Sequence, residues 1–422
     1  MINVRRVALA ALITALLLVG CSLNRADPRP TATPDVPTPD TPLIVAWAAD
    51  GDLVVWRSGE DLPRRIASGG VIRPLLAPDG ASVAYLRGPE GDPRSLWISD
   101  AAGTAERQLV DTAALAGNGE TRRLSQIVWS PDGATIYFTT LSGDSLHMGE
   151  ADDLWRVDPR GGMPERLLAD GDGGLIAASP DGAMLALASA GEYETAPGTI
   201  ALYVPATGER RRVLDFPAVA TGSEQRWHPD LRWLPDGSGL LAALPPADLV
   251  YGGGDDPATA LWSIPVDGDA QPTGRVEADF FGLPVFSADG AYVAYFARRA
   301  TPDQNTFQLM IAARDGSSPA AYAEGGLDAL TLATWLPQGD RFVYGSGAPG
   351  EWWLGQPGAE PSRFPATDTS VAGIVWADPD TYVFSTRGED GFTLSFGLLD
   401  VPVRPHEIAT LETYPFFNAV LP

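Results

Sequence analysis

The sequence contains a single cysteine, three histidines and no lysine. Because Cys21 is the only cysteine among 422 residues, no intramolecular disulfide and no thiolate metal cluster can form. All 29 basic residues are arginine, so Schiff-base and general-base chemistry that depends on lysine is excluded. Acidic residues number 54, and a surface with a formal net charge of −25 repels phosphate backbones. We therefore expect no nucleic-acid partner.

Well-formed helical periodicity is also missing after residue 20, whereas 46 glycines and 38 prolines are spread along the chain. Such a composition favours an all-β fold with many turns. A length of 422 residues is enough for more than one ordinary domain, but an array of repeats can also fold as a single body.

One short pattern recurs along the chain: an apolar stretch, a turn of the form Ser-Pro-Asp-Gly, and a second apolar stretch. The clearest copy spans residues 127–140. Proline presets φ, aspartate can bond to its own backbone and glycine takes the left-handed position, so each copy is predicted to be an antiparallel hairpin. Other copies have their turns at residues 78–80, 180–182, 235–237, 288–290, 337–339 and 377–380. Three copies depart from the pattern: Ala288 replaces the proline, Gln338 replaces the aspartate, and the last copy has no glycine.

Each hairpin is followed by an aromatic-bearing strand and, after a glycine-containing turn, by a short fourth strand. Four antiparallel strands at a period of about 40–55 residues are typical of a β-propeller blade. Seven complete units run from Ile72 to Leu411, and residues 44–67 supply three further strands. We predict that residues 416–421 provide the missing inner strand, which would remove exposed sheet edges. The prediction is an all-β chain: one propeller of eight four-stranded blades, closed by strands from both chain ends. Seven blades are the alternative if the C-terminal residues do not pair.

The Ser-Pro-Asp-Gly hairpins with trailing Leu-Trp strands resemble the WD-like repeats of TolB-type propellers. The resemblance covers residues 43–422 and implies the propeller architecture. TolB carries an additional N-terminal α/β domain, where this chain has a proline-rich segment. The resemblance therefore does not transfer the translocation role of TolB.

The N-terminal residues have the pattern of an export signal. Arg5 and Arg6 precede an apolar run, and residues 18–21 end in Cys21. This ending resembles the bacterial lipoprotein box, which implies cleavage before Cys21 and its diacylation. We expect a signal peptide at residues 1–20, a lipidated cysteine and Pro/Thr-rich extended tether at 21–42, and the propeller at 43–422.

In a propeller the b–c and d–a loops emerge on one face, and here nearly all the length variation lies in those loops. Binding residues are common on loops held by a rigid scaffold, so this face is the predicted site. Its candidate residues are acidic or aromatic, with one histidine. They are Asp152, Asp153, Tyr193, Glu194, Trp227, His228, Tyr251, Asp255 and Asp256.

We expect an extracytoplasmic binding protein without catalysis of its own. Its lipid would hold it on the outer face of the cytoplasmic membrane, or on an outer membrane where there is one. The expected partner is a protein or an envelope polymer, and the chain is expected to be a monomer without a cofactor. Two alternatives stay open. The loop carboxylates could act on glycans as a lyase or hydrolase, or they could bind Ca²⁺ in a structural propeller.

Overall fold

The computed structural model of the chain describes residues 41–88, 95–115, 121–143, 148–222, 226–251, 257–298, 306–326, 330–346, 351–364, 370–401 and 405–422. Two compact units divide the chain, residues 1–34 and 35–422, and the described residues all belong to the second. The predicted signal peptide, Cys21 and all but the last two residues of the predicted tether lie outside the described residues.

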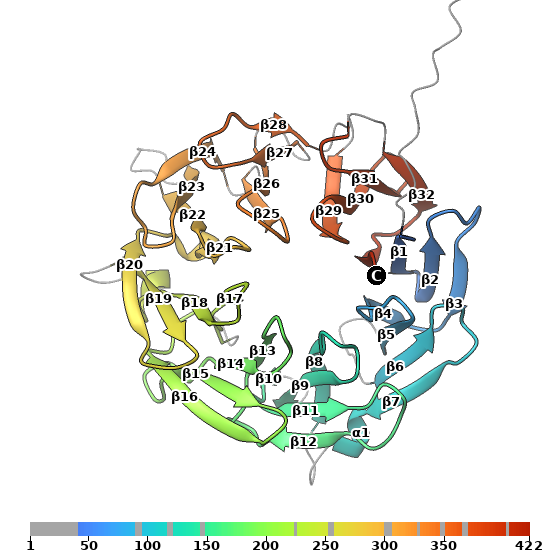
Figure 1. Cartoon of the computed structure of the whole chain (residues 1–422), viewed down its shortest axis with the longest axis horizontal. Helices are drawn as coiled ribbons and strands as arrows, with labels where there is room; N and C mark the ends of the chain where they lie inside the picture. Colours follow the sequence, from blue (N-terminus) through green and yellow to red (C-terminus); the bar gives the residue numbers. More distant parts are fainter. Residues whose placement is uncertain are drawn as a thin grey trace, which may run out of the picture. The chain divides into compact units, whose positions relative to one another are not determined.

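The second unit is an eight-bladed β-propeller, in which eight sheets surround a central axis (Figure 1). Blade 1 joins both ends of the described chain and consists, from its inner to its outer strand, of β33 (Phe416–Val420), β1 (Ile44–Ala49), β2 (Asp52–Arg57) and β3 (Arg64–Ala67). Blade 2 consists of β4 (Val71–Leu76), β5 (Ser82–Arg87), β6 (Ser95–Asp100) and β7 (Arg107–Asp111). Blade 3 consists of β8 (Thr121–Trp129), β9 (Ile136–Gly143), β11 (Leu154–Val157) and β12 (Glu165–Leu168), with β10 (Met148–Glu150) added on β9.

The remaining blades follow the chain in order. Blade 4 consists of β13 (Leu175–Ala178), β14 (Leu185–Ser189), β15 (Gly198–Val204) and β16 (Glu209–Phe216), and blade 5 of β17 (Leu231–Trp233), β18 (Gly239–Leu244), β19 (Thr259–Pro265) and β20 (Gln271–Val276). Blade 6 consists of β21 (Val285–Phe286), β22 (Tyr292–Arg298), β23 (Phe307–Ala313) and β24 (Ala320–Gly325). Blade 7 consists of β25 (Thr331–Trp335), β26 (Phe342–Gly345), β27 (Trp352–Gly355) and β28 (Ser362–Arg363), and blade 8 of β29 (Ser370–Trp376), β30 (Thr381–Arg387), β31 (Phe392–Leu398) and β32 (His406–Leu411).

The ring closes as the sequence predicts. Strand β33 pairs antiparallel with β1, with Ile44 opposite Val420 and Ala48 opposite Phe416. The side-chain oxygen of Asn418 then accepts a hydrogen bond from the backbone N–H of Leu76, 2.9 Å away in blade 2. The eight-blade prediction is confirmed, and the seven-blade alternative is wrong because the C-terminal strand is paired.

The repeated turns hold together through the residues that define them. In blade 3 the Ser130 hydroxyl donates to Asp132 Oδ1 at 2.6 Å, and the same oxygen accepts the backbone N–H of Ala134 at 3.0 Å. The equivalent pair in blade 4, Ser179 and Asp181, has the same geometry. Because these donors favour the charged carboxylate, the hydroxyl first and the backbone second, they lower the pKa of both aspartates.

The core lies between neighbouring blades, where apolar side chains from facing sheets interleave. Leu96 of blade 2 and Phe138 of blade 3, for example, are completely buried in one such cluster. Tryptophans at the ends of three inner strands add a hydrogen bond from each blade to the one before it. Their indole N–H groups donate from Trp129 to Leu75 O at 3.2 Å, from Trp233 to Ala177 O at 2.9 Å and from Trp335 to Val285 O at 2.9 Å.

A few elements lie outside the four-strand pattern. Strand β10 extends blade 3 to five strands, because the chain after β9 folds back and pairs with it. Within the described ranges, three short helices occur in connections: α1 (Thr112–Leu115), η1 (Leu249–Tyr251) and η2 (Phe280–Gly282). None of the helices in the described ranges is long and apolar enough to cross a membrane.

Candidate functional site

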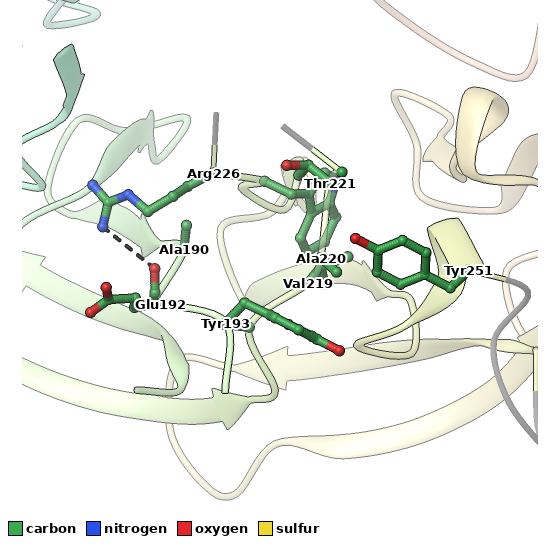
Figure 2. Close-up of a pocket in the computed structure, with 12 residues that line it drawn as sticks. Ala190, Glu192, Tyr193, Val219, Ala220, Thr221, Arg226 and Tyr251 are labelled. Atoms are coloured by element: carbon green, nitrogen blue, oxygen red, sulfur yellow. Dashed lines mark hydrogen bonds between the residues drawn. The ribbon is translucent and has the colours of Figure 1, made fainter. Parts of the chain in front are cut away.

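Three connections converge between blades 4 and 5 on the face predicted to bind. They are the β14–β15 loop, the connection from β16 to β17 and the β18–β19 loop. Together they form a cavity of about 560 Å³, which we call the loop cavity. Its walls are Ala190, Gly191, Glu192, Tyr193, Ala218, Val219, Ala220, Thr221, Gly222, Arg226, Trp227 and Tyr251. Eight of these residues are labelled in Figure 2.

Aromatic side chains dominate the exposed surface of the loop cavity. Tyr193 is 39% exposed and Tyr251 is 71% exposed, which is high for rings of this size. Trp227 is half-buried and packs edge-on against Phe216 at the end of β16, with 6.1 Å between ring centroids. Figure 2 shows both tyrosine rings at one end of the cavity and Arg226 at the other. Exposed aromatic rings beside a hollow are a common basis for ligand contact.

Arg226 closes its end of the loop cavity and is held by three acceptors. Its guanidinium forms an ion pair with Asp152 at 3.0 Å and donates to the carbonyl of Gly191 at 3.5 Å, the bond dashed in Figure 2, and to the carbonyl of Glu150. Its positive charge is therefore compensated inside the protein, and these contacts fix the β14–β15 loop against blade 3.

Asp152 is the centre of this arrangement. Its side chain is 3% exposed, and its backbone has a left-handed φ of 48°. Oδ1 lies 3.1 Å from Nε2 of His228, while Oδ2 accepts from the Ser189 hydroxyl at 3.1 Å in addition to Arg226. Both carboxylate oxygens thus have partners, and this buried side chain joins the β16–β17 connection, through Arg226 and His228, to the end of β14 at Ser189.

The neighbouring Asp153 is fully buried and belongs to the core of blade 3. Its oxygens accept from the backbone and hydroxyl of Thr140 at 2.8 and 2.6 Å and from the indole of Trp155 at 2.6 Å. The guanidinium of Arg122, which is also buried, lies 3.1 Å away and reaches Asp170 at 2.7 Å. Both oxygens of Asp153 are therefore used in holding the blade.

Glu150, at the end of β10, lies beside these two aspartates. Burial raises the pKa of its carboxyl group, and a hydrogen bond from the Ser125 hydroxyl opposes this shift only in part. Its second oxygen, Oε2, is buried and has no hydrogen-bond partner among the described residues. This carboxyl group is consequently less well satisfied than its neighbours.

The structure brings together five of the nine ligand-binding candidates: Tyr193, Trp227 and Tyr251 on the cavity wall, and Asp152 with His228 beneath it. Glu194 is exposed next to Tyr193, and its backbone has a φ of 64°. Asp153 lies in the core, and Asp255 and Asp256 lie outside the described residues.

Sequence reasoning missed Arg226, which connects the aromatic wall to the buried aspartate. The only signal in the sequence is its position directly before Trp227 and His228, because an exposed arginine on an acidic loop face is usually a solvated charge. No group of three or more histidine, cysteine or carboxylate residues in the described ranges could hold a metal ion. Asp152 and Asp153 are also poorly placed to bind Ca²⁺, because each already forms an ion pair with an arginine.

No model of a known protein family matches the sequence, and no curated protein matches it. Solved structures do match in fold. Dipeptidyl peptidase 4 of Porphyromonas gingivalis has a TM-score of 0.51 and 14% identity, over 82% of this chain and 54% of that one. A eukaryotic initiation factor has a TM-score of 0.50 and 10% identity, over 90% of this chain and 99% of that one.

TolB of Acinetobacter baumannii matches with a TM-score of 0.34 and 18% identity, over 68% of this chain and 64% of that one. The chain thus spans only about half to two thirds of the length of the peptidase and of TolB. Identities this low show a shared fold alone. The chain is a β-propeller, similar to TolB and to peptidase propellers at low identity.

Proposed function

We propose that this propeller is a binding protein of the cell envelope, and that it recognises a protein partner or an envelope polymer through the loop cavity. A lipid on Cys21 would hold it at the outer face of the cytoplasmic membrane, or at an outer membrane where one exists. The proposal rests on the convergence of three loops from two blades around exposed aromatic rings, beside a buried aspartate, Asp152, that holds Arg226 of one of these loops.

The occupied state of the carboxylates supports binding over catalysis. A general acid or base must be free to exchange a proton with a substrate. Three of the four oxygens of Asp152 and Asp153 already accept hydrogen bonds or ion pairs from the protein, and the fourth, Asp152 Oδ1, lies 3.1 Å from His228 Nε2. In the loop cavity a ligand can instead contact the aromatic rings, the Glu192 carboxylate and backbone groups.

Site-specific photocrosslinking in cells tests this proposal directly. A photoreactive phenylalanine analogue would replace Tyr193 or Tyr251 in the full-length chain. The matched control is Tyr414, which is 41% exposed in the connection between β32 and β33. We expect the same adduct, a protein or a polymer, from both cavity positions and none from position 414. An adduct formed equally at all three positions, or at none, would contradict the proposal.

Binding of the captured partner should then depend on the rings. We expect Tyr193→Ser combined with Tyr251→Ser to weaken binding by at least about tenfold, because aromatic anchors carry much of the energy of such contacts. Both rings are exposed, so the melting temperature should not change. Turnover of an envelope glycan that requires Asp152 would favour the enzyme alternative over binding.

The anchor is tested separately. In cells fed an alkyne-labelled fatty acid, the full chain should incorporate the label and sediment with membranes. We expect Cys21→Ser to abolish both. Unchanged labelling of the serine variant would reject the lipid anchor without affecting the role proposed for the loop cavity.

A further inference from the structure

A second cavity, larger than the first, lies on the opposite face of the ring. Its volume is about 670 Å³, and we call it the axial cavity. Its walls are Ala177, Ala178, Pro180, Leu231, Arg232, Trp233, Pro235, Ala288, Asp289, Pro337, Gln338 and Gly339. These residues belong to the inner strands β13 and β17 or to the a–b turns of blades 4 to 7. Four consecutive blades of eight meet only near the axis, so the cavity lies at the centre of the a–b turn face.

Two of the three departures from the repeated turn lie in this cavity. Ala288 stands where the other turns have proline, and Gln338 stands where they have aspartate. The first change removes a ring from the wall, and the second replaces a carboxylate with a neutral amide that can donate hydrogen bonds. Neither change is needed to form a turn, since unmodified copies form the same hairpins. Their meeting in one cavity points to a ligand.

The cavity also contains an arginine without a partner. Arg232 is half-buried in the middle of β17, where it pairs in register with Leu241. Its Nε is buried without a hydrogen-bond partner, and no described carboxylate lies within ion-pairing distance of its guanidinium. A buried N–H donor such as this Nε is unfavourable without an acceptor, and a ligand in the cavity could supply one.

The one carboxylate in the wall, Asp289, is engaged in its own turn. Its Oδ1 accepts from the Ser287 hydroxyl at 2.6 Å and from the backbone N–H of Ala291 at 2.9 Å. The rest of the wall is largely apolar. The exposed rings of Pro180, Pro235 and Pro337 stand at equivalent turn positions, and the buried indole of Trp233 is fixed by its hydrogen bond to Ala177. The cavity is therefore pre-formed.

We propose that the axial cavity binds a carboxylate group attached to an apolar body, with Arg232 and the amide of Gln338 as its donors. Guanidinium and carboxylate match in shape and form paired hydrogen bonds. A phosphate fits less well, because a single arginine would face a second negative charge inside a protein of net charge −25. The carboxylate can come from a small organic acid or from the C-terminus of a peptide.

Isothermal titration of the purified full-length chain tests this site with three probes: N-acetyl-Leu-Leu as the free acid, its C-terminal amide, and 4-methylpentanoate. We expect the free acid to bind at least tenfold more tightly than the amide, and its binding to weaken as salt rises. Equal binding of 4-methylpentanoate would identify a small acid as the ligand, and binding of the dipeptide acid alone would identify a chain terminus. Either result supports the site.

Three variants locate the binding. Arg232→Met keeps the apolar stem and should reduce acid binding to the level of the amide. Gln338→Asp restores the repeated turn while adding a negative charge, and it should weaken acid binding at least threefold in a chain that still folds. The control is Arg210→Met in the outer strand β16, where another half-buried arginine has an unpartnered Nε. It should bind like the unmodified chain.

Two results would overturn the proposal. The first is an unmodified chain that binds none of the probes, or binds acid and amide equally. The second is acid binding that survives both Arg232→Met and Gln338→Asp. The loop cavity lies on the other face, so either result leaves the proposed function intact.

Discussion

The loop cavity and the axial cavity are built from different parts of the same repeat. The loop cavity is formed by connections that vary in length from blade to blade, and buried Asp152 binds Arg226 of one of them, while Asp153 and its ion pair with Arg122 hold the adjoining blade 3. The axial cavity is formed by inner strands and by a–b turns that follow one repeated pattern, and in blades 4 and 6 a serine and an aspartate within the turn hold it. At the loop cavity, the blades position loops that are not part of the repeat. At the axial cavity, single-residue changes within the repeated turn alter the surface.

This difference predicts where the molecule is vulnerable. Removing one partner of a buried ion pair costs much stability, because the other charge is left buried without compensation. A substitution in one a–b turn should cost little stability, because the turn is solvated and its hydrogen bonds are local. Substitutions beneath the loop cavity should therefore cost more stability than equivalent substitutions at the axial cavity.

The largest effect is expected from Asp153→Ala in blade 3. It leaves the guanidinium of Arg122, whose side chain is 4% exposed, without its buried counter-ion. We expect a loss of about 3–5 kcal/mol in the free energy of unfolding, measured by denaturant titration. The control is Asp158→Ala, which breaks the exposed pair with Arg160 and should have no measurable effect. Similar losses for the two variants would show that the buried pair of Asp153 and Arg122 contributes no more stability than an exposed pair.

A glycine in each cavity allows a closer comparison. Gly191 and Gly339 have nearly the same φ, 70° and 73°, so an alanine at either position is equally strained by its backbone. The available space differs. A Cβ on Gly191 would lie 2.4 Å from the backbone N of Gly198, whereas a Cβ on Gly339 would meet nothing within 4 Å.

We expect Gly339→Ala to cost about 1–2 kcal/mol, the strain of a left-handed alanine alone. Gly191→Ala should cost roughly 2–4 kcal/mol, because the β14–β15 loop must also move away. Thermal and denaturant unfolding of both variants measures the difference. Equal losses would mean that the loop yields freely and that the loop cavity is not rigid.

The inter-blade tryptophans give the next effect. Trp233→Phe keeps the ring but leaves the Ala177 carbonyl without its donor, so we expect a loss of about 1–2 kcal/mol. Trp376→Phe is the control, because Trp376 Nε1 is buried without a partner among the described residues and nothing is lost when it is removed. A loss of the same size from Trp376→Phe would show that packing of the ring, and not its hydrogen bond, links the blades.

The fold could be predicted from the sequence because its information is local and repeated. Each Ser-Pro-Asp-Gly turn specifies a hairpin through its own hydrogen bonds, and the lack of an inner strand at residues 44–67 pointed to the C-terminal residues. The fifth strand β10 was not predicted, because Met148–Glu150 has no place in the repeat and pairs only once β9 continues past its neighbours.

The candidate site could be predicted only in part. Aromatic residues in long loops indicated Tyr193, Trp227 and Tyr251, since loops of adjacent blades share a face. The contact of Arg226 with Asp152 joins residues 74 positions apart through irregular backbone, and no periodicity encodes it. The sequence did not indicate the axial cavity, for a different reason. Ala288 and Gln338 each look like a tolerated change in a turn, and only the ring geometry places them in one wall.

The smallest effect concerns pH, and it has opposite signs in the two regions. Burial raises the folded pKa of Glu150 beneath the loop cavity, so the contribution of this group to wild-type stability falls as pH rises from about 4.5 through that pKa. Glu150→Gln removes this fall, and the variant should gain stability relative to the wild type as pH rises.

In the turn beside Pro180, the Ser179 hydroxyl lowers the folded pKa of Asp181. Its contribution is present above pH 3.8 and is lost as pH falls through the folded value.

Asp181→Asn lacks that contribution, so it should lose stability relative to the wild type as pH rises toward 3.8 and differ from it by a constant amount above. Urea unfolding of the wild type and both variants between pH 3 and 7 gives the two difference curves. A rising curve for Glu150→Gln and a falling one for Asp181→Asn would place an unfavourable buried charge under the loops and favourable solvated charges in the turns. Difference curves of the same sign would contradict this contrast between the buried carboxyl group of Glu150 and the hydrogen-bonded carboxylate of Asp181.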